Sequence, residues 1–240
     1  MLPSSTPLTA LETRVTREGA RPLFTWYQPS SGARIELSAT TFANWVDKAC
    51  NLCGTLGVDD EPVVGLSVLH DHPGHWLSWV WVFAAWQAGG RVVVATRGDL
   101  GMVDLAVIGP DDPRPVPGAE TVACSLHPLG LGFPEPTPGV TDAQEILSEP
   151  DVHQPGSPER SGVWWTVENH DSTGQDMTGD DLAALPPLDS RVLLRASSAE
   201  SVLTAFVGVL LGGGSLVVVD GPVDDDQLAA IAASERVDAG

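Results

Sequence analysis

Short apolar segments alternate with helical segments over the first half of the chain, and this order is what most restricts its fold. Four segments are predicted strands: residues 34–37, 63–69, 91–95 and 103–108. Residues 40–56 have the three- and four-residue apolar spacing of an amphipathic helix, and a second helix is expected between Asp71 and Gly89. Strands that alternate with helices favour an α/β fold of layered, largely parallel sheets flanked by helices.

Capping signals set the expected ends of these two helices. Ser38 or Thr40 can cap the first helix, and Gly57 is expected to end it. Asp71 is expected to cap the second helix, with Pro73 in its first turn.

Prolines recur after residue 109, and they divide the chain into parts. Three parts are expected, namely a first α/β lobe, a Pro-rich connector packed on it and a second α/β lobe, at residues 1–110, 111–160 and 161–240. The connector is predicted to hold one short helix over residues 141–147, because Thr141 and Gln144 match a capping box.

The second lobe repeats the rhythm of the first. A capping box at Ser197 and Glu200 predicts a helix that ends at the glycine triplet 212–214, and Asp224 is expected to cap a last helix over residues 225–236. Three segments are predicted strands: residues 163–166, 191–194 and 216–219.

The charge balance excludes several classes of protein. The chain has 32 acidic and 12 basic residues, for a formal net charge of −20, and Lys48 is its single lysine. A nucleic-acid binder needs a basic surface, so no nucleic-acid partner is expected. None of the six residues before Lys48 is glycine, which excludes a G-x-x-x-x-G-K-[ST] phosphate loop.

No membrane partner is expected either. Residues 76–90 are apolar but too short to cross about 30 Å of hydrocarbon, and the glycine triplet divides the apolar stretch 202–219 into a helix-like and a strand-like half. The start of the chain has no basic and apolar export signal, and the sparse cysteines indicate reduced thiols, so a cytoplasmic location is predicted.

Taken in order, these segments resemble the N-terminal part of the adenylate-forming superfamily, which includes acyl-CoA synthetases, peptide-synthetase adenylation domains and luciferases. Residues 34–95 match best: Ile35–Ser38, a helix and Leu56–Val58 look like the family's opening unit, and residues 88–94 look like the Ala-Gly-Ala-Val-Val-Val close of its next unit. Residues 103–109 and, more weakly, 191–221 are similar to later units. The chain resembles more closely the short actinobacterial proteins related to these enzymes, and its Arg-rich, Lys-poor composition fits a GC-rich genome.

The resemblance fails at the family's phosphate loop, which reads roughly T-S-G-T-T-G-x-P-K-G and holds the ATP phosphates. The segment in its place, 166–179, keeps Thr166 and Ser172-Thr173-Gly174 but has no lysine. Three carboxylates add negative charge there, at Glu168, Asp171 and Asp176, although Mg²⁺ could offset part of it. The family's Tyr-Gly-x-Thr-Glu motif, its catalytic lysine and its C-terminal domain are not found, and Thr178-Gly179-Asp180 spells the ribose motif at a different place.

Three histidines, two cysteines and the tryptophans offer other candidate sites. His70, His72 and His75 could hold a metal with Asp71, or could form a polar loop between a strand and a helix. Cys50 and Cys53 form a C-x-x-C pair that is better explained as buried thiols than as a redox site. The tryptophans indicate a core role, except that Trp81 lies off the apolar stripe of its helix and is expected at an interface.

The sequence therefore predicts a truncated adenylate-forming-like protein without a working adenylation site, acting in binding or regulation. No catalytic, cofactor-binding or metal-binding residue and no cofactor is assigned. The alternative is a divergent acyl or aryl adenylate or CoA ligase that needs a partner chain. A protein or small-molecule partner of unknown identity is expected, together with a homo-oligomer that covers exposed apolar surface.

Overall fold

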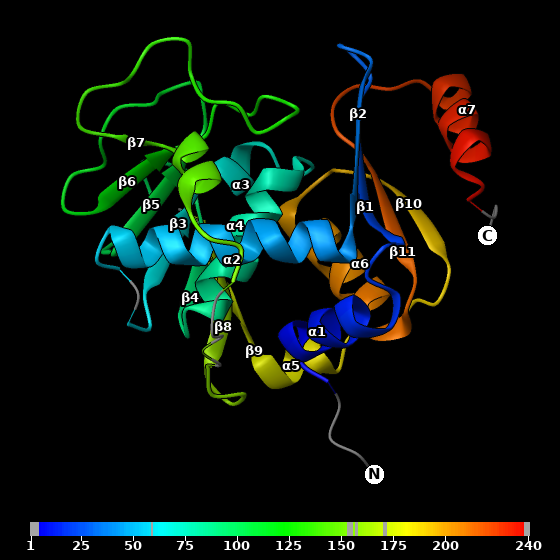
Figure 1. Cartoon of the computed structure of the whole chain (residues 1–240), viewed down its shortest axis with the longest axis horizontal. Helices are drawn as coiled ribbons and strands as arrows, with labels where there is room; N and C mark the ends of the chain where they lie inside the picture. Colours follow the sequence, from blue (N-terminus) through cyan, green and yellow to red (C-terminus); the bar gives the residue numbers. More distant parts are fainter. Residues whose placement is uncertain (1–4, 59, 153–155, 157, 170–171, 238–240) are drawn as a thin grey trace. The chain divides into compact units, whose positions relative to one another are not determined.

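The computed structural model describes residues 5–58, 60–152, 156, 158–169 and 172–237 (Figure 1). The chain folds as two compact units. Unit 1 consists of Met1–Ala43, Pro73–Trp76 and Asp181–Gly240, and unit 2 of Asn44–His72 and Leu77–Asp180. Each of the three predicted parts is one continuous stretch of sequence, whereas unit 1 combines three separate stretches and unit 2 combines two. Strands distant in sequence pair within each unit, and this pairing is what interleaves the segments.

Unit 1 is built on a four-stranded sheet of order β10–β11–β1–β2. Strand β1 pairs in parallel with β11 and antiparallel with β2. The strands are β1 (Pro22–Gln28), β2 (Ala33–Ser38), β10 (Arg191–Arg195) and β11 (Ser215–Val219). The helices are α1 (Pro7–Glu18), α6 (Ala199–Gly212), α7 (Asp225–Glu235) and the start of α2 (Ala39–Thr55). The Phe206 ring of α6 lies edge-on to Phe24 and Phe42, with ring centroids 5.1 and 5.2 Å away, so one aromatic cluster joins the helices to the sheet.

Unit 2 is built on a seven-stranded sheet of order β7–β6–β5–β3–β4–β8–β9, in which every pair but β8–β9 is parallel. The strands are β3 (Val63–Leu66), β4 (Arg91–Val94), β5 (Leu105–Ile108), β6 (Glu120–Ala123), β7 (Thr141–Asp142), β8 (Val163–Asn169) and β9 (Ser172–Thr178). The other elements are α3 (Ser67–Asp71), α4 (Trp76–Gln87), the 3-10 helix η1 (Ala143–Ser148) and the start of α5 (Gly179–Ala183), whose last three residues belong to unit 1. The predicted fold class, layered and largely parallel sheets flanked by helices, is confirmed.

Helix α4 is buried along its whole length, which corrects the prediction for Trp81. Its residues from Trp76 to Gln87 are all buried, and Trp81 is 0% exposed. A helix that is apolar all round has no solvent face. Trp81 is therefore a buried residue like Trp79 and Trp86, so of the predicted lobe or subunit interface the subunit-interface position was wrong.

The capping residues at both ends of the first helix were predicted correctly, whereas the start of the second helix was not. Ser38 Oγ accepts a hydrogen bond from Thr41 N, and Gly57 has a φ of 75° just past α2. Strand β3 stops at Leu66 and α3 follows it, so Asp71 ends a short helix and does not cap α4. The apolar run 63–69 suits a buried strand and a buried helical turn equally well.

Capping in the second half differs from the predictions by one residue at two helices. Ser198, with Ser201, forms the capping box of α6 in place of Ser197 and Glu200. Asp142 caps η1 in place of Thr141. Helix α7 begins at the predicted capping residue, Asp224.

The apolar stretch 202–219 divides as predicted. Helix α6 ends at Gly213, which has a φ of 84°, and strand β11 follows. Within the described part of the chain, no helix combines the length and the apolar character needed to cross a membrane.

Candidate functional site

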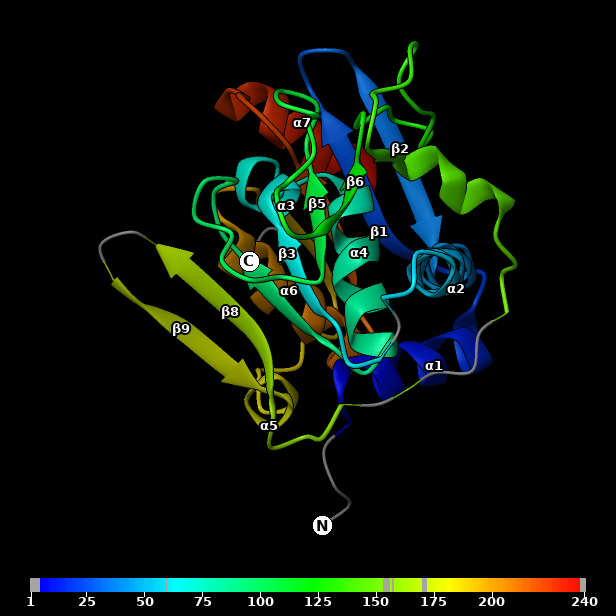
Figure 2. The ribbon, with the colours of Figure 1, turned by 90° about the vertical axis from the view of Figure 1, so that its left-hand side faces the viewer.

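The candidate site is the β8–β9 hairpin at one edge of the sheet of unit 2 (Figure 2). Strand β8 runs parallel to β4, with Trp165 opposite Val92. It runs antiparallel to β9, with Thr166 opposite Asp176 and Asn169 opposite Ser172. The hairpin contains the segment that takes the place of the phosphate loop in the resembled family.

Among the described residues of this segment, the structure brings Thr166 and Asp176 together. Thr166 is buried and its Oγ1 donates a hydrogen bond to Asp176 Oδ1 at 2.7 Å. Asp171 lies outside the described residues, as do the side chains of Ser172 and Thr173. The threonine hydroxyl is thus already used within the hairpin, by a carboxylate.

Buried tryptophans fix the strand that carries Thr166. Trp164 and Trp165 are 0% and 1% exposed. The Trp86 indole N–H donates to the Trp164 carbonyl at 2.8 Å, and the Trp79 and Trp165 rings stack with centroids 6.1 Å apart. The aromatic core of unit 2 therefore positions β8.

Thr178-Gly179-Asp180 has a structural role. A Cβ atom on Gly179 would lie 2.7 Å from Trp164 Cε2, so α5 can start here only with glycine. Asp180 Oδ1 accepts from Arg160 Nε at 2.9 Å. These contacts account for the glycine and the aspartate, and they tie α5 to the segment before β8.

The electrostatics of the hairpin disfavour a polyphosphate. Residues 163–169 and 172–178 include Glu168 and Asp176 but no lysine or arginine. Phosphate sites in proteins are made by cations, free backbone N–H groups and bound metal ions. No group of three or more His, Cys, Asp or Glu side chains that could hold a metal occurs among the described residues.

The histidines do not form the metal site that the sequence left open. In unit 2, His70 Nδ1 lies 2.8 Å from Asp71 Oδ1, and His72 Nε2 lies 3.8 Å from Asp111 Oδ2. His75 belongs to unit 1, where it is buried and its ring lies 4.7 Å from that of Trp26. Each histidine thus has local contacts of its own.

The cysteines are buried thiols, as predicted. Cys50, Cys53 and Cys124 are buried and form no disulfide among the described residues. Burial raises the pKa of the Cys124 thiol to about 12, against the opposing effect of a hydrogen bond with Trp81. A thiol with that pKa is protonated at neutral pH and is a poor nucleophile.

The single lysine holds part of the connector. Lys48 Nζ donates to the Glu149 carbonyl, and Asn51 Nδ2 donates to the Pro150 carbonyl at 2.8 Å. Thr55 Oγ1 donates to Glu149 Oε1 at 2.9 Å. One face of α2 therefore binds the backbone of the segment that follows η1.

Replacing Lys48 by methionine is expected to loosen this segment. Methionine keeps the apolar stem but removes the donor, so the free energy of unfolding should fall by about 1 kcal/mol. Proteolysis between residues 148 and 152 should become faster. Denaturant unfolding and limited proteolysis with mass spectrometry measure the two effects. Lys48→Arg, which keeps the donors, is the control, and unchanged proteolysis in Lys48→Met would contradict this role.

Comparisons with known proteins bear on the whole chain. No protein-family model matches the sequence. The chain is 29% identical over 239 residues to a Mycobacterium tuberculosis (strain ATCC 25618 / H37Rv) protein described as a TIGR03089 family protein, over 90% of this chain and 89% of that protein. It is similar to a Brucella canis acyl-CoA synthetase with a TM-score of 0.73 and 14% identity, over 97% of this chain and 46% of the enzyme.

Two further solved structures are similar. The long-chain-fatty-acid-CoA ligase FadD1 of Archaeoglobus fulgidus matches with a TM-score of 0.73 and 13% identity, over 98% of this chain and 50% of that one. The N-terminal domain of FACL13 from Mycobacterium tuberculosis matches with a TM-score of 0.71 and 13% identity, over 97% of this chain and 61% of that one. The chain has the fold of the N-terminal part of acyl-CoA synthetases. It spans about half the length of the Brucella and Archaeoglobus proteins.

Proposed function

We propose that this chain is a non-catalytic binding or regulatory protein built on the adenylate-forming fold. The observation that carries the proposal is the β8–β9 hairpin. The two strands pair from Val163 with Thr178 to Asn169 with Ser172, so the backbone groups that face across the hairpin bond each other and not a ligand. ATP carries several negative charges, and these strands offer two carboxylates and no basic side chain.

The local contacts strengthen this interpretation. In the resembled family, small hydroxyl groups of the phosphate loop bind phosphate oxygens. Here the Thr166 hydroxyl donates to Asp176, so phosphate binding would have to break that bond and bring anions next to a carboxylate. Adenylate formation also requires stabilisation of charge that develops on the phosphates, and the side chains that the structure describes in these two strands include no cation for it.

The second candidate function is a divergent acyl or aryl adenylate or CoA ligase that works with a partner chain. The similarity to an acyl-CoA synthetase over 97% of this chain favours it. Fold alone does not transfer an activity, because one fold can carry many functions. The two candidates differ in whether the hairpin binds ATP at all.

Purified protein with ATP, Mg²⁺ and a panel of carboxylic acids is expected to show no ATP–pyrophosphate exchange. ATP is also expected to leave the melting temperature unchanged, because a ligand that does not bind the folded state cannot stabilise it. Radiolabelled pyrophosphate exchange and thermal-shift assays measure these outcomes, with an acyl-CoA synthetase of the same fold as positive control.

Exchange by the purified chain would contradict the proposal. Exchange that appears only after cell extract is added would support the partner-dependent ligase. In either case Asp176→Asn should then alter ATP affinity, because Asp176 lies in the hairpin, whereas Asp111→Asn should not.

A cytoplasmic location and self-association remain predictions. Light scattering coupled to size-exclusion chromatography measures the mass of the particle in solution. A monomer at all accessible concentrations would remove the predicted homo-oligomer.

A further inference from the structure

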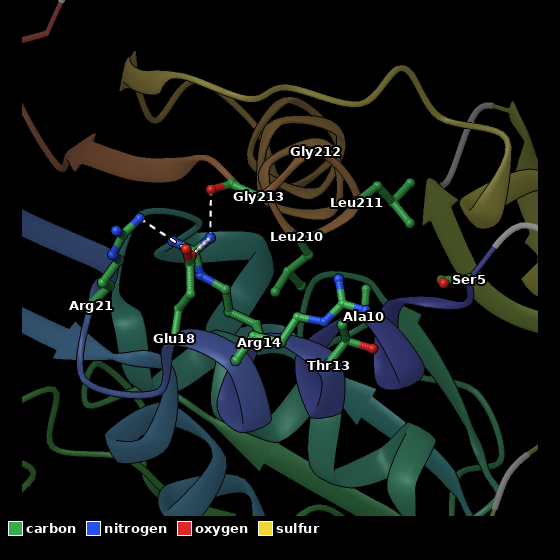
Figure 3. A pocket seen from close by; sticks show the side chains of 11 residues that line it. Ser5, Ala10, Thr13, Arg14, Glu18, Arg21, Leu210, Leu211, Gly212 and Gly213 are labelled. Atoms are coloured by element: carbon green, nitrogen blue, oxygen red, sulfur yellow. Dashed lines mark hydrogen bonds and ion pairs between the residues drawn. The ribbon is translucent and has the colours of Figure 1, made fainter.

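A pocket of about 410 Å³ lies within unit 1, between helix α1 and the C-terminal end of α6 (Figure 3). Its apolar lining includes Ala10 of α1 and Leu210 and Leu211 of α6. Its charged lining consists of three arginines and one glutamate: Arg14, Arg17, Arg21 and Glu18. The pocket thus has both apolar and charged lining residues.

The charged residues that line the pocket include more cations than anions. Glu18 forms ion pairs with Arg14 at 2.7 Å and with Arg21 at 2.9 Å (Figure 3). Arg17 is exposed and forms no ion pair within the part of the chain that the structure describes. The pocket therefore has three guanidinium groups and one carboxylate, an excess of two positive charges. The excess is notable because the whole chain has a formal net charge of −20.

Arg14 lines the pocket but is held by contacts within unit 1. It is 9% exposed, and one of its terminal nitrogens donates to the Gly213 carbonyl at the end of α6. Its Nε has no hydrogen-bond partner among the described residues, and this atom is buried from solvent and therefore also from a ligand in the pocket. The guanidinium groups open to a ligand are those of the exposed Arg17 and Arg21.

We propose that this pocket binds a small organic dianion, of the phosphate monoester or dicarboxylate class. Guanidinium groups recognise both anions through paired hydrogen bonds. The two negative charges of such a ligand would balance the two excess positive charges of the pocket. The volume of the pocket lies in the range of small-molecule sites. The anionic group lies by Arg17 and Arg21, and the apolar part lies against Leu210 and Leu211. This site shares no residue with the β8–β9 hairpin, so the proposal of a dianion site does not depend on the proposed function.

The test uses the full chain with phenyl phosphate and glutarate as probes. Isothermal titration calorimetry at low ionic strength should detect binding of at least one dianion, and none of benzyl alcohol, which lacks the charge. Arg17→Gln should weaken the affinity about tenfold or more, because it removes charge-assisted hydrogen bonds. Arg17 is exposed, so this variant should keep the melting temperature of the unmodified chain.

Arg114→Gln is the matched control, since Arg114 is exposed and lies in unit 2. It makes the same change in net charge and should leave the affinity within about twofold. The bound dianion should also protect Arg17 and Arg21, but not Arg114, from modification by phenylglyoxal. No detectable binding of either dianion, or an equal loss in Arg17→Gln and Arg114→Gln, would overturn the proposal. The two probes distinguish phosphate esters from dicarboxylates.

Discussion

Replacing Trp86 by alanine is expected to lower the free energy of unfolding of unit 2 by about 3–5 kcal/mol, the largest effect predicted for this chain. Trp86 is 0% exposed, and its ring lies 5.0 Å from that of Phe83 and 5.6 Å from that of Trp164. Alanine would leave a cavity among these rings and would remove the donor to the Trp164 carbonyl. Because β8 carries that carbonyl, the loss should also loosen the β8–β9 hairpin.

Two further variants separate packing from hydrogen bonding. Trp86→Phe keeps an aromatic ring but leaves the Trp164 carbonyl without the indole donor, so a loss of about 1–3 kcal/mol is expected. Trp45→Phe, at a half-buried position on α2, should cost less than about 1 kcal/mol. Denaturant unfolding followed by fluorescence gives the free energies, and hydrogen exchange of residues 163–178 reports on the hairpin. A loss below about 1 kcal/mol in Trp86→Ala would show that this packing does not stabilise unit 2.

Replacing Glu235 by glutamine is expected to release helix α7 from unit 1. The structure describes every residue of α7, and Glu235 is the buried one among them. Its carboxylate accepts hydrogen bonds from Arg34 Nε at 2.8 Å, from the Tyr27 hydroxyl and from Arg191. One carboxylate therefore holds the helix to three side chains of the sheet.

The expected loss of stability is about 2–3 kcal/mol. Removing one partner of a fully buried ion pair costs about 3–5 kcal/mol, because the remaining charge stays buried. The side chain of Arg34 is 41% exposed, so solvent screens part of this network and the loss should be smaller. Glu12→Gln, the same substitution at an exposed position of α1, is the control and should change the free energy of unfolding by less than about 0.5 kcal/mol.

The same carboxylate gives a pH dependence of known sign. Burial would raise the pKa of Glu235, but hydrogen bonds from Arg34, Tyr27 and Arg191 outweigh it and lower the pKa from 4.5 to about 2. Because the pKa of Glu235 is lower in the folded chain, the unfolded chain binds the proton at a higher pH. The contribution of the Glu235 carboxylate to stability is therefore complete above about pH 5 and is lost as the pH falls from 4.5 towards 2.

Denaturant unfolding across this acid range, with hydrogen exchange of α7, measures the effect. The free energy of unfolding of Glu235→Gln should vary less with pH than that of the unmodified chain. Parallel pH curves for the two proteins would mean that Glu235 is not the group responsible. Unchanged exchange of α7 at neutral pH would mean that other contacts hold the helix.

Elements with strong local signals were predicted closely from the sequence. Helix α2 was expected over residues 40–56 and spans Ala39–Thr55, because its apolar spacing and flanking caps agree. Helix α7 and strand β11 were predicted for similar reasons. The glycine triplet after α6 separates a helix from a strand because Gly213 adopts a positive φ. The separation could be inferred from the position of the three glycines in the sequence.

Elements that depend on distant partners were not predicted. Strand β1 has seven residues without a regular alternation of polar and apolar side chains, and it becomes a strand between β11 and β2. Helix α1 contains three threonines, which are weak helix formers, and it packs on α6. Strand β6 has four residues inside the Pro-rich connector. Tertiary pairing decided each of them, and a single sequence does not reveal such pairing.

The same reason explains what was missed at the pocket of unit 1. Arg14 and Arg17 are three residues apart, which places them along one side of a helix, and Arg21 follows shortly after the end of α1. This spacing is a usable signal, but only once α1 is recognised as a helix. Nothing in the sequence places Leu210 and Leu211 opposite these arginines.

The parallel pairing of β1 with β11 also bears on the order in which the protein forms during synthesis. Phe24 lies opposite Leu216 and Tyr27 opposite Val219, so the sheet of unit 1 joins segments made early and late by the ribosome. All strands of unit 2 lie between Val63 and Thr178. Unit 2 can therefore assemble while the later residues are still being translated. Strand β1 can pair with β2 early, but its other edge lacks its partner until β11 emerges, so the burial of Leu23, Phe24 and Trp26 is completed late.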